Sequence, residues 1–172
     1  MISGLLLVFF ITLSRLLELW RSSVNTKNLI KLGAREHYPF HYNFIVCFHI
    51  SFILYFFLLS FDKPQINYFY LFIFLGLQVL RIKIISDLGK FWTTRIIVLE
   101  NTPLIKHGIY KYFKHPNYAL VFFEILVLCL TFNDLFAFIL FGVLNTILLG
   151  IRIFYENKAN KNRINKDLSN DR

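Results

Sequence analysis

The chain has 172 residues, of which 56% are hydrophobic and 19% aromatic, and its mean hydropathy is +0.55. A soluble domain of this length needs far less apolar surface, so the composition excludes the soluble globular classes and indicates a surface that faces lipid. Basic loops beside anionic headgroups explain the net charge of +9, so membrane lipids are expected partners and nucleic acid is not.

Largely apolar runs that approach the length needed to cross a bilayer, about 20 residues, occur in five places. They cover residues 2–19, 42–60, 67–88, 116–132 and 134–156. We therefore expect one all-α membrane domain over residues 1–172, built as a polytopic bundle of about five transmembrane helices. The last two runs meet at Asn133 and Asp134, a connection so short that it predicts an antiparallel C-terminal helical hairpin.

The positions of lysine and arginine predict the orientation, because cytoplasmic loops retain positive charge. Four basic residues follow the first run, seven lie between Arg81 and Lys114, and six lie from Arg152 to the end. The other connections hold only Lys63, balanced by Asp62. We expect an integral membrane protein with its N-terminus outside and its C-terminus in the cytoplasm. The bias toward Phe, Ile, Lys and Asn favours a bacterial plasma membrane.

The first run does not read as a cleaved signal peptide. It lacks a basic start and a small-x-small cleavage site, and it carries Arg15 and Glu18, so we expect it to remain in the mature protein. No metal site is expected either: His37 and His41 have the spacing of helical ligands, but Pro39 lies between them.

Residues 89–115 form a basic connection that is longer than a compact bundle needs unless it has a function. Its mixture of aromatic, aliphatic and basic residues suits a segment on the membrane surface that covers a cofactor pocket from the water side. A simple interfacial anchor is the alternative. The polar tail, residues 157–172, is expected to be a frayed helix or disordered.

The sharpest local pattern is GIYKYFKHPNY, over residues 108–118. A residue before proline avoids helical geometry and proline suits the first helical position, so a helix should begin at Pro116 with His115 just outside it. The free backbone N–H groups of residues 117–119 would favour an anion, such as the carboxylate of an amino-acid-like cofactor. A proline-started helix beside interfacial tyrosines is the alternative.

Arg152 and Glu156 lie four residues apart near the end of the last run, and therefore on one helix face. Arginine before glutamate is the less favourable order for an ion pair, and a glutamate near a helix C-terminus opposes the dipole, so a surface ion pair explains the pattern poorly. We interpret Arg152 as a bidentate ligand for an acceptor carboxylate. Glu156 would accept hydrogen bonds from ribose hydroxyls or an ammonium group.

Three polar residues, His49, Glu124 and Asn145, interrupt apolar runs. Such residues usually face the interior of a membrane bundle. Glu124 lies about 12 Å along its helix from Pro116 and is expected either to line an acceptor channel or to make a hydrogen bond between helices. The hydrogen-bonding alternative applies equally to the other two.

Taken together, the motifs resemble the isoprenylcysteine carboxyl methyltransferases over residues 88–158. The matching residues are Gly108-x-Tyr110, His115-Pro116-x-Tyr118, the helical hairpin, Arg152 and Glu156. The N-terminal half resembles the bacterial branch of that family more weakly, at Arg15-Leu-Leu-Glu18, Gly33-Ala34-Arg35-Glu36, His41-Tyr42 and His49.

This resemblance implies a membrane O-methyltransferase that uses S-adenosylmethionine to methylate a carboxyl or hydroxyl group of a lipophilic or prenylated acceptor. In the bacterial branch the acceptors are small hydrophobic compounds such as alkylpyrones. It implies that Arg152 is catalytic and contacts the acceptor. The cofactor would be held by Arg95, Pro103, Leu104, Ile105, Tyr110, His115, Pro116, Asn117, Tyr118 and Glu156. Catalysis would rest on positioning and desolvation.

The chain departs from the family at a few positions. Lys114 replaces the usual arginine before His-Pro, Ala119-Leu120 replaces a glycine-containing pair, and Asn157 interrupts an acidic run. Lysine keeps the charge but lacks the planar guanidinium fork. A phospholipid-type N-methyltransferase, which shares His-Pro-x-Tyr, stays open as an alternative. So does a non-catalytic membrane scaffold with a degenerate site.

Overall fold

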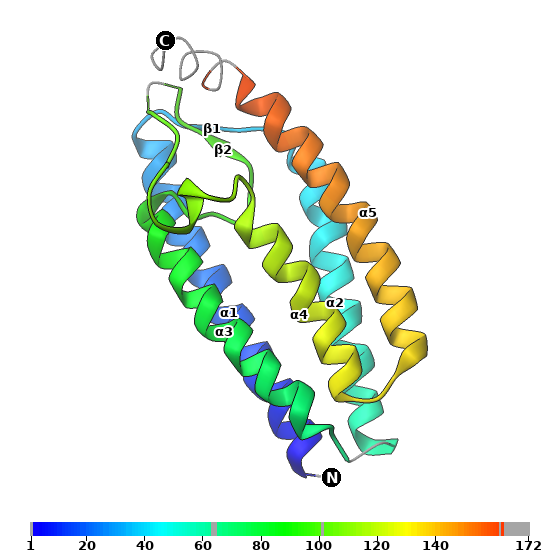
Figure 1. The fold of residues 1–172 in the computed structure, drawn as a ribbon. Coiled ribbons are helices and arrows are strands. Elements are labelled where there is room, and N and C mark those ends of the chain that lie inside the picture. Colours follow the sequence, from blue (N-terminus) through cyan, green and yellow to red (C-terminus); the bar gives the residue numbers. More distant parts are fainter. Residues whose placement is uncertain (1, 63–64, 101, 162, 164–172) are drawn as a thin grey trace.

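The computed structural model describes residues 2–62, 65–100, 102–161 and 163. Within these residues the chain forms the α-helices α1 (Ile2–Lys31), α2 (Pro39–Asp62), α3 (Tyr68–Leu88), α4 (Pro116–Thr131) and α5 (Leu135–Ala159). They lie side by side in an elongated bundle, with the N-terminus at one end and the end of α5 at the other (Figure 1). The all-α polytopic bundle predicted from the sequence is confirmed.

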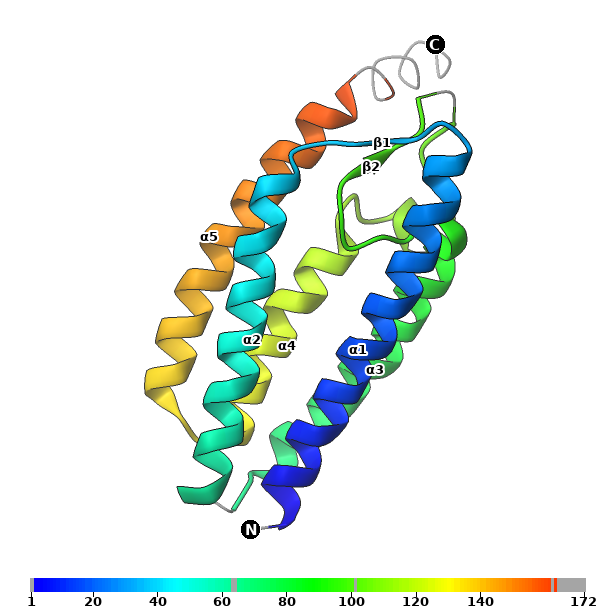
Figure 2. The same cartoon turned by 180° about the vertical axis from the view of Figure 1, so that it is seen from behind.

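Four of these helices, α1, α2, α3 and α5, are long and apolar enough to cross a membrane. Helix α4 has 16 residues and covers roughly 24 Å, less than a hydrocarbon core of about 30 Å. It begins deeper in the bundle than the ends of α1 and α5, beneath the segment that connects it to α3 (Figure 1, Figure 2). The short helix thereby leaves room at this end of the bundle.

Helix α1 ends at Lys31 rather than near Leu19, where its apolar run stops. Charged residues end an apolar run without ending a helix, and the last turns of α1 carry Arg21 and Lys27. A helix boundary is not a membrane boundary, so the predicted spans and single membrane domain stay predictions. In the predicted tail, α5 continues to Ala159, and residues 162 and 164–172 lie outside the described residues.

A short strand pair joins the α1–α2 connection to the segment after α3. β1 (Arg35–Glu36) pairs antiparallel with β2 (Ile97–Val98), and the connection crosses the end of the bundle as a strap (Figure 2). Arg95 adds an ion pair at 2.8 Å to Glu36, and its guanidinium lies 4.7 Å from the centroid of the Tyr42 ring. These contacts hold the long connection against the bundle.

The turn between α4 and α5 has the sequence that the predicted hairpin requires. Asn133 has a φ of 51°, in the left-handed region that asparagine tolerates better than most residues. Asp134 caps α5, because its Oδ1 accepts the N–H of Ala137 at 2.9 Å. The confirmed hairpin places the end of α5 beside the start of α4.

Phenylalanine rings build much of the apolar core. The ring of Phe141 on α5 lies edge-on to Phe48 and Phe52 on α2, with centroids 5.9 and 4.9 Å apart. Leu7 and Val8, in the first turns of α1, belong to the same core. Apolar packing therefore fixes α2 against the hairpin and holds the beginning of α1.

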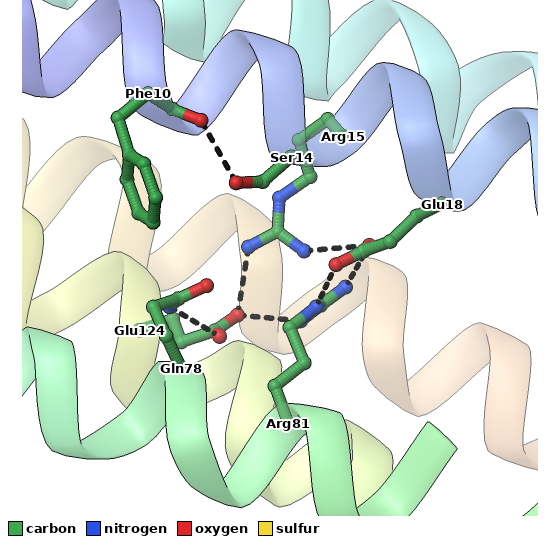
Figure 3. Close-up of polar contacts among 7 residues, drawn as sticks. All are labelled: Phe10, Ser14, Arg15, Glu18, Gln78, Arg81 and Glu124. Carbon is green, nitrogen blue, oxygen red and sulfur yellow. Dashed lines mark hydrogen bonds and ion pairs between the residues drawn. The ribbon is translucent and has the colours of Figure 1, made fainter. Parts of the chain in front are cut away.

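Farther along α1, charged residues that are half-buried on α1 and buried on α3 and α4 connect these helices (Figure 3). Arg15 donates to Glu18 and Glu124, at 2.9 Å each. Arg81 donates to Glu18 at 2.5 and 2.6 Å and to Glu124 at 2.6 Å, and Gln78 donates to Glu124 at 2.8 Å. Two cations and two anions balance, as charges within a membrane bundle must. We call these five residues the ion network.

Candidate active site

A cavity of about 800 Å³, a size typical of cofactor sites, lies at the end of the bundle that carries β1 and β2. Its walls come from the segment between α3 and α4, the start of α4 and the end of α5. It is lined by every residue that the sequence analysis predicted as catalytic or cofactor-binding: Arg95, Pro103, Leu104, Ile105, Tyr110, His115, Pro116, Asn117, Tyr118, Arg152 and Glu156. We call it the upper cavity. The roles of these residues stay predictions.

Helix α4 begins at Pro116, and His115 is its N-cap, as predicted. The expected row of free N–H groups is only partly present. The N–H groups of Tyr118 and Ala119 donate to the carbonyl of His115, at 3.2 and 3.4 Å. Of the three predicted donors, the N–H of Asn117 has no backbone partner among the described residues and could serve a ligand. A tight first turn has taken up most of the predicted anion site.

Tyr118 connects the two charged residues at the end of α5. Its hydroxyl donates to Glu156 Oε2 and accepts a hydrogen bond from Nε of Arg152, 2.9 Å away. The ring of His115 stacks on that of Tyr118 with centroids 5.4 Å apart, and His115 Nδ1 lies 3.9 Å from Glu156 Oε1. Arg152 and Glu156 are thus joined through Tyr118, and the surface ion pair considered as an alternative does not describe them.

Arg152 is buried, with 8% of its surface exposed. Its guanidinium carbon lies 5.4 Å from the centroid of the Tyr118 ring, which favours the cation. Among the described residues its hydrogen-bond partner is Tyr118, which uses Nε. The two Nη groups are left to bind a ligand oxygen, in the fork that matches a carboxylate.

Three buried polar atoms of residues on the wall of the upper cavity have no hydrogen-bond partner in the described part of the chain. They are Tyr110 Oη, His115 Nε2 and Asn117 Oδ1. Burial, together with the negative charges of Glu156 and Asp87, raises the pKa of Tyr110, so its hydroxyl stays a donor. Buried polar atoms are normally paired, so these atoms indicate a polar ligand.

A second cavity, of about 700 Å³, lies deeper in the bundle between α1, α2 and α5, and we call it the lower cavity. Its lining is mostly aliphatic and phenylalanine side chains. Trp92, Thr93, Asn117, Tyr118 and Arg152 line both cavities. The two cavities therefore meet at the Tyr118–Arg152 contact, where ligands bound on either side would be brought together.

Residues 69–161, more than half of the chain, match the model of the isoprenylcysteine carboxyl methyltransferase family. The chain belongs to this family. The uncharacterized protein YpbQ of Bacillus subtilis (strain 168) is 34% identical over 158 residues, which cover 90% of this chain and 94% of the relative. No solved structure matches the chain significantly. The resemblance drawn from the motifs is confirmed, and the protein is a member of a membrane methyltransferase family.

In this member of the isoprenylcysteine carboxyl methyltransferase family, the three polar residues within apolar runs have different surroundings. Glu124 makes the hydrogen bonds between helices that were one of its two alternatives. His49 instead donates from Nδ1 to the carbonyl of Ile45 on its own helix. Asn145 is 2% exposed, and its Nδ2 has no partner among the described residues. His49 and Asn145 both line the lower cavity.

The last turns of α1 support the site through contacts that no sequence motif indicates. Nδ2 of Asn25 donates to the carbonyls of Gly89 and Trp92, at 3.0 and 2.8 Å. The hydroxyl of Ser22 accepts the N–H of Thr94 at 2.8 Å. Ser22 and Asn25 are three residues apart, which places them on one face if this part of the chain is helical. Because the apolar run ends near Leu19, the sequence does not show that the helix continues through these two residues.

Gly108 is expected to be essential for the position of Tyr110, because both belong to η2 (Gly108–Lys111). Its φ is +58°, and an added Cβ would lie 2.1 Å from Oδ2 of Asp87, which accepts the N–H of Ile109 at 3.0 Å. Gly108→Ala should cost about 1–3 kcal/mol in strain and weaken cofactor binding roughly 10-fold. Calorimetry and thermal unfolding measure the two effects.

Gly89→Ala is the matched control, since Gly89 also has a positive φ, +52°, but nothing lies within 4 Å of an added Cβ. Gly89→Ala therefore has the strain of a positive φ but no steric clash with a neighbouring side chain. Equal losses of cofactor affinity in the two variants would contradict the role assigned to the contact with Asp87.

Proposed function

We propose that the protein transfers a methyl group from S-adenosylmethionine to a carboxyl or hydroxyl oxygen of a lipophilic acceptor. The observation that carries the proposal is the meeting of the two cavities at Tyr118 and Arg152. The upper cavity is polar enough for a charged cofactor, and the lower cavity is apolar enough for a lipid. Bringing both reactants to one point accounts for catalysis without a covalent enzyme intermediate.

The upper cavity suits the cofactor by the chemistry of its lining. Tyr110 donates through its hydroxyl, Asn117 accepts through its amide oxygen, and Glu156 accepts from hydroxyl or ammonium groups. Pro103, Leu104 and Ile105 supply an apolar wall for a purine ring, and Arg95 lines the same cavity. Bound here, S-adenosylmethionine would supply an electrophilic sulfonium methyl group.

At the junction, Arg152 would hold the acceptor oxygen. A guanidinium favours an oxyanion and repels an ammonium group, so Arg152 favours O-methylation over the phospholipid-type N-methylation kept as an alternative. Methylation of a carboxylate needs no proton transfer. Displacement of water from the junction would strengthen the Arg152 interaction.

The scaffold alternative explains the upper cavity poorly. A scaffold does not need Tyr110, His115 and Asn117 to bury polar atoms that lack partners in the described structure, and such atoms cost free energy unless a ligand pairs them. The acceptor would be a small lipophilic or prenylated compound that enters from the bilayer. The exposed apolar side chains would contact membrane lipids.

For orientation, we propose that the end of the bundle with the upper cavity faces the cytoplasm of a bacterium and that the N-terminus lies outside. The basic connections before α2 and before α4 lie at this end, as does the basic C-terminal end of α5 (Figure 1). The positive-inside rule places such an end in the cytoplasm.

Calorimetric binding of S-adenosylmethionine and S-adenosylhomocysteine to the detergent-purified protein tests the proposal. Glu156→Ala should weaken binding of both by roughly 10- to 100-fold, because a charged acceptor of hydrogen bonds is lost. Glu100→Ala is the control, since Glu100 is exposed and does not line either cavity. No binding to folded wild-type protein would favour the scaffold.

A further inference from the structure

Asn145 is a buried amide on the wall of the lower cavity. Its side chain lies on α5 two helical turns from Arg152, about 10 Å along the helix axis. It lines the lower cavity while being 2% exposed, and its Nδ2 has no hydrogen-bond partner among the described residues. An amide buried among apolar side chains is costly unless something in the cavity accepts its hydrogen bond.

His49 supplies a complementary group on the wall formed by α2. Its Nδ1 donates to the carbonyl of Ile45 at 2.8 Å, so in the neutral ring Nε2 is the acceptor. His49 therefore carries an acceptor and Asn145 a donor, and both residues line the same cavity. Ring contacts between Phe48 and Phe141 set α2 against α5 near this depth.

The ion network occupies a similar depth on the other helices. Glu124 lies six residues beyond Tyr118 on α4, about 9 Å farther along the helix. Arg15, Glu18 and Arg81 of the network line the lower cavity, but their charges are already paired with one another (Figure 3). At this depth Nδ2 of Asn145 has no partner among the described residues, and the neutral ring of His49 offers Nε2 as an acceptor, so a neutral oxygen suits the position better than a charged group.

We propose that His49 and Asn145 form a second polar subsite for the acceptor. The acceptor is then a lipid whose chain carries a hydroxyl or carbonyl oxygen about 10 Å from the oxygen that is methylated. An unbroken hydrocarbon or isoprenoid chain would leave Nδ2 of Asn145 without an acceptor and would bring no donor to Nε2 of His49. The inference rests on the proposed function, because it takes Arg152 as the anchor of the methylated end.

Two matched acids test the subsite: 10-hydroxyoctadecanoic acid and octadecanoic acid. Their partition is measured between nanodiscs with and without the protein, in the presence of S-adenosylhomocysteine. The hydroxy acid should bind about 10-fold more tightly, the effect of roughly one net hydrogen bond. Asn145→Leu and His49→Leu should each reduce this ratio toward one, because each removes one polar partner.

Gln78→Leu is the matched control. It removes another amide at this depth, but that amide is paired with Glu124 and does not line the lower cavity. It should lower stability and leave the ratio unchanged. Equal binding of the two acids, or an unchanged ratio in the Asn145 and His49 variants, would overturn the subsite. Failure of both acids to bind would overturn this acceptor class, while retained binding of S-adenosylhomocysteine would leave the methyltransferase proposal intact.

Discussion

Arg152→Lys is expected to lower the rate of methyl transfer by about 100-fold or more, with little change in cofactor affinity. Lysine keeps the positive charge but offers one compact ammonium group, which cannot both bond Tyr118 and grip two acceptor oxygens. Cofactor affinity should persist because Glu156, the predicted cofactor ligand on α5, is unchanged. The rate is measured as transfer of a radiolabelled methyl group from saturating S-adenosylmethionine to a bacterial lipid extract.

Calorimetry on the same preparation separates the two effects. Arg21→Lys serves as the control, because Arg21 is exposed on α1 and lines neither cavity. Full activity of Arg152→Lys would remove Arg152 from the acceptor site. Loss of cofactor binding without a folding defect would move it to the cofactor side of the junction.

The sequence predicts the bundle well because its strongest signals are local. Apolar runs mark the helices, and Asn133 with Asp134 marks the hairpin turn. The pairing of β1 with β2 carries no such signal, since two residues on each side form too short a stretch for strand periodicity. The extension of α1 beyond its apolar run to Lys31 has no such signal either, because hydropathy reports lipid contact and not the end of a helix.

For the site, a contiguous motif predicts the start of α4 and its neighbours around the upper cavity. Such a motif cannot predict contacts that depend on how two helices are aligned with each other. Tyr118 bridges Arg152 and Glu156 only because the hairpin aligns two residues more than 30 positions away on another helix. The lower cavity likewise depends on the gap between α1 and α2. No residue pattern in either helix predicts the width of that gap.

Removing one charge from the ion network is expected to destabilise the bundle strongly. Arg81→Leu leaves Glu18 and Glu124 with Arg15 as their remaining cationic partner, so one buried negative charge is uncompensated. Removing one partner of a buried ion pair costs about 3–5 kcal/mol. The free energy of unfolding in mixed micelles should fall by that amount. Lys83→Leu, on the same helix, is the control and should cost far less, because the Lys83 side chain is 60% exposed.

A double substitution distinguishes charge imbalance from lost packing. Arg81→Leu with Glu18→Leu leaves Arg15 paired with Glu124 at 2.9 Å and restores neutrality. The double variant should therefore be more stable than Arg81→Leu alone, although it has lost two native side chains. If the losses in the free energy of unfolding for the two single variants simply add in the double variant, the network stabilises α1 through side-chain packing and not through charge pairing. The lower cavity would then owe its wall to packing alone, and methyl transfer should survive in any variant that folds.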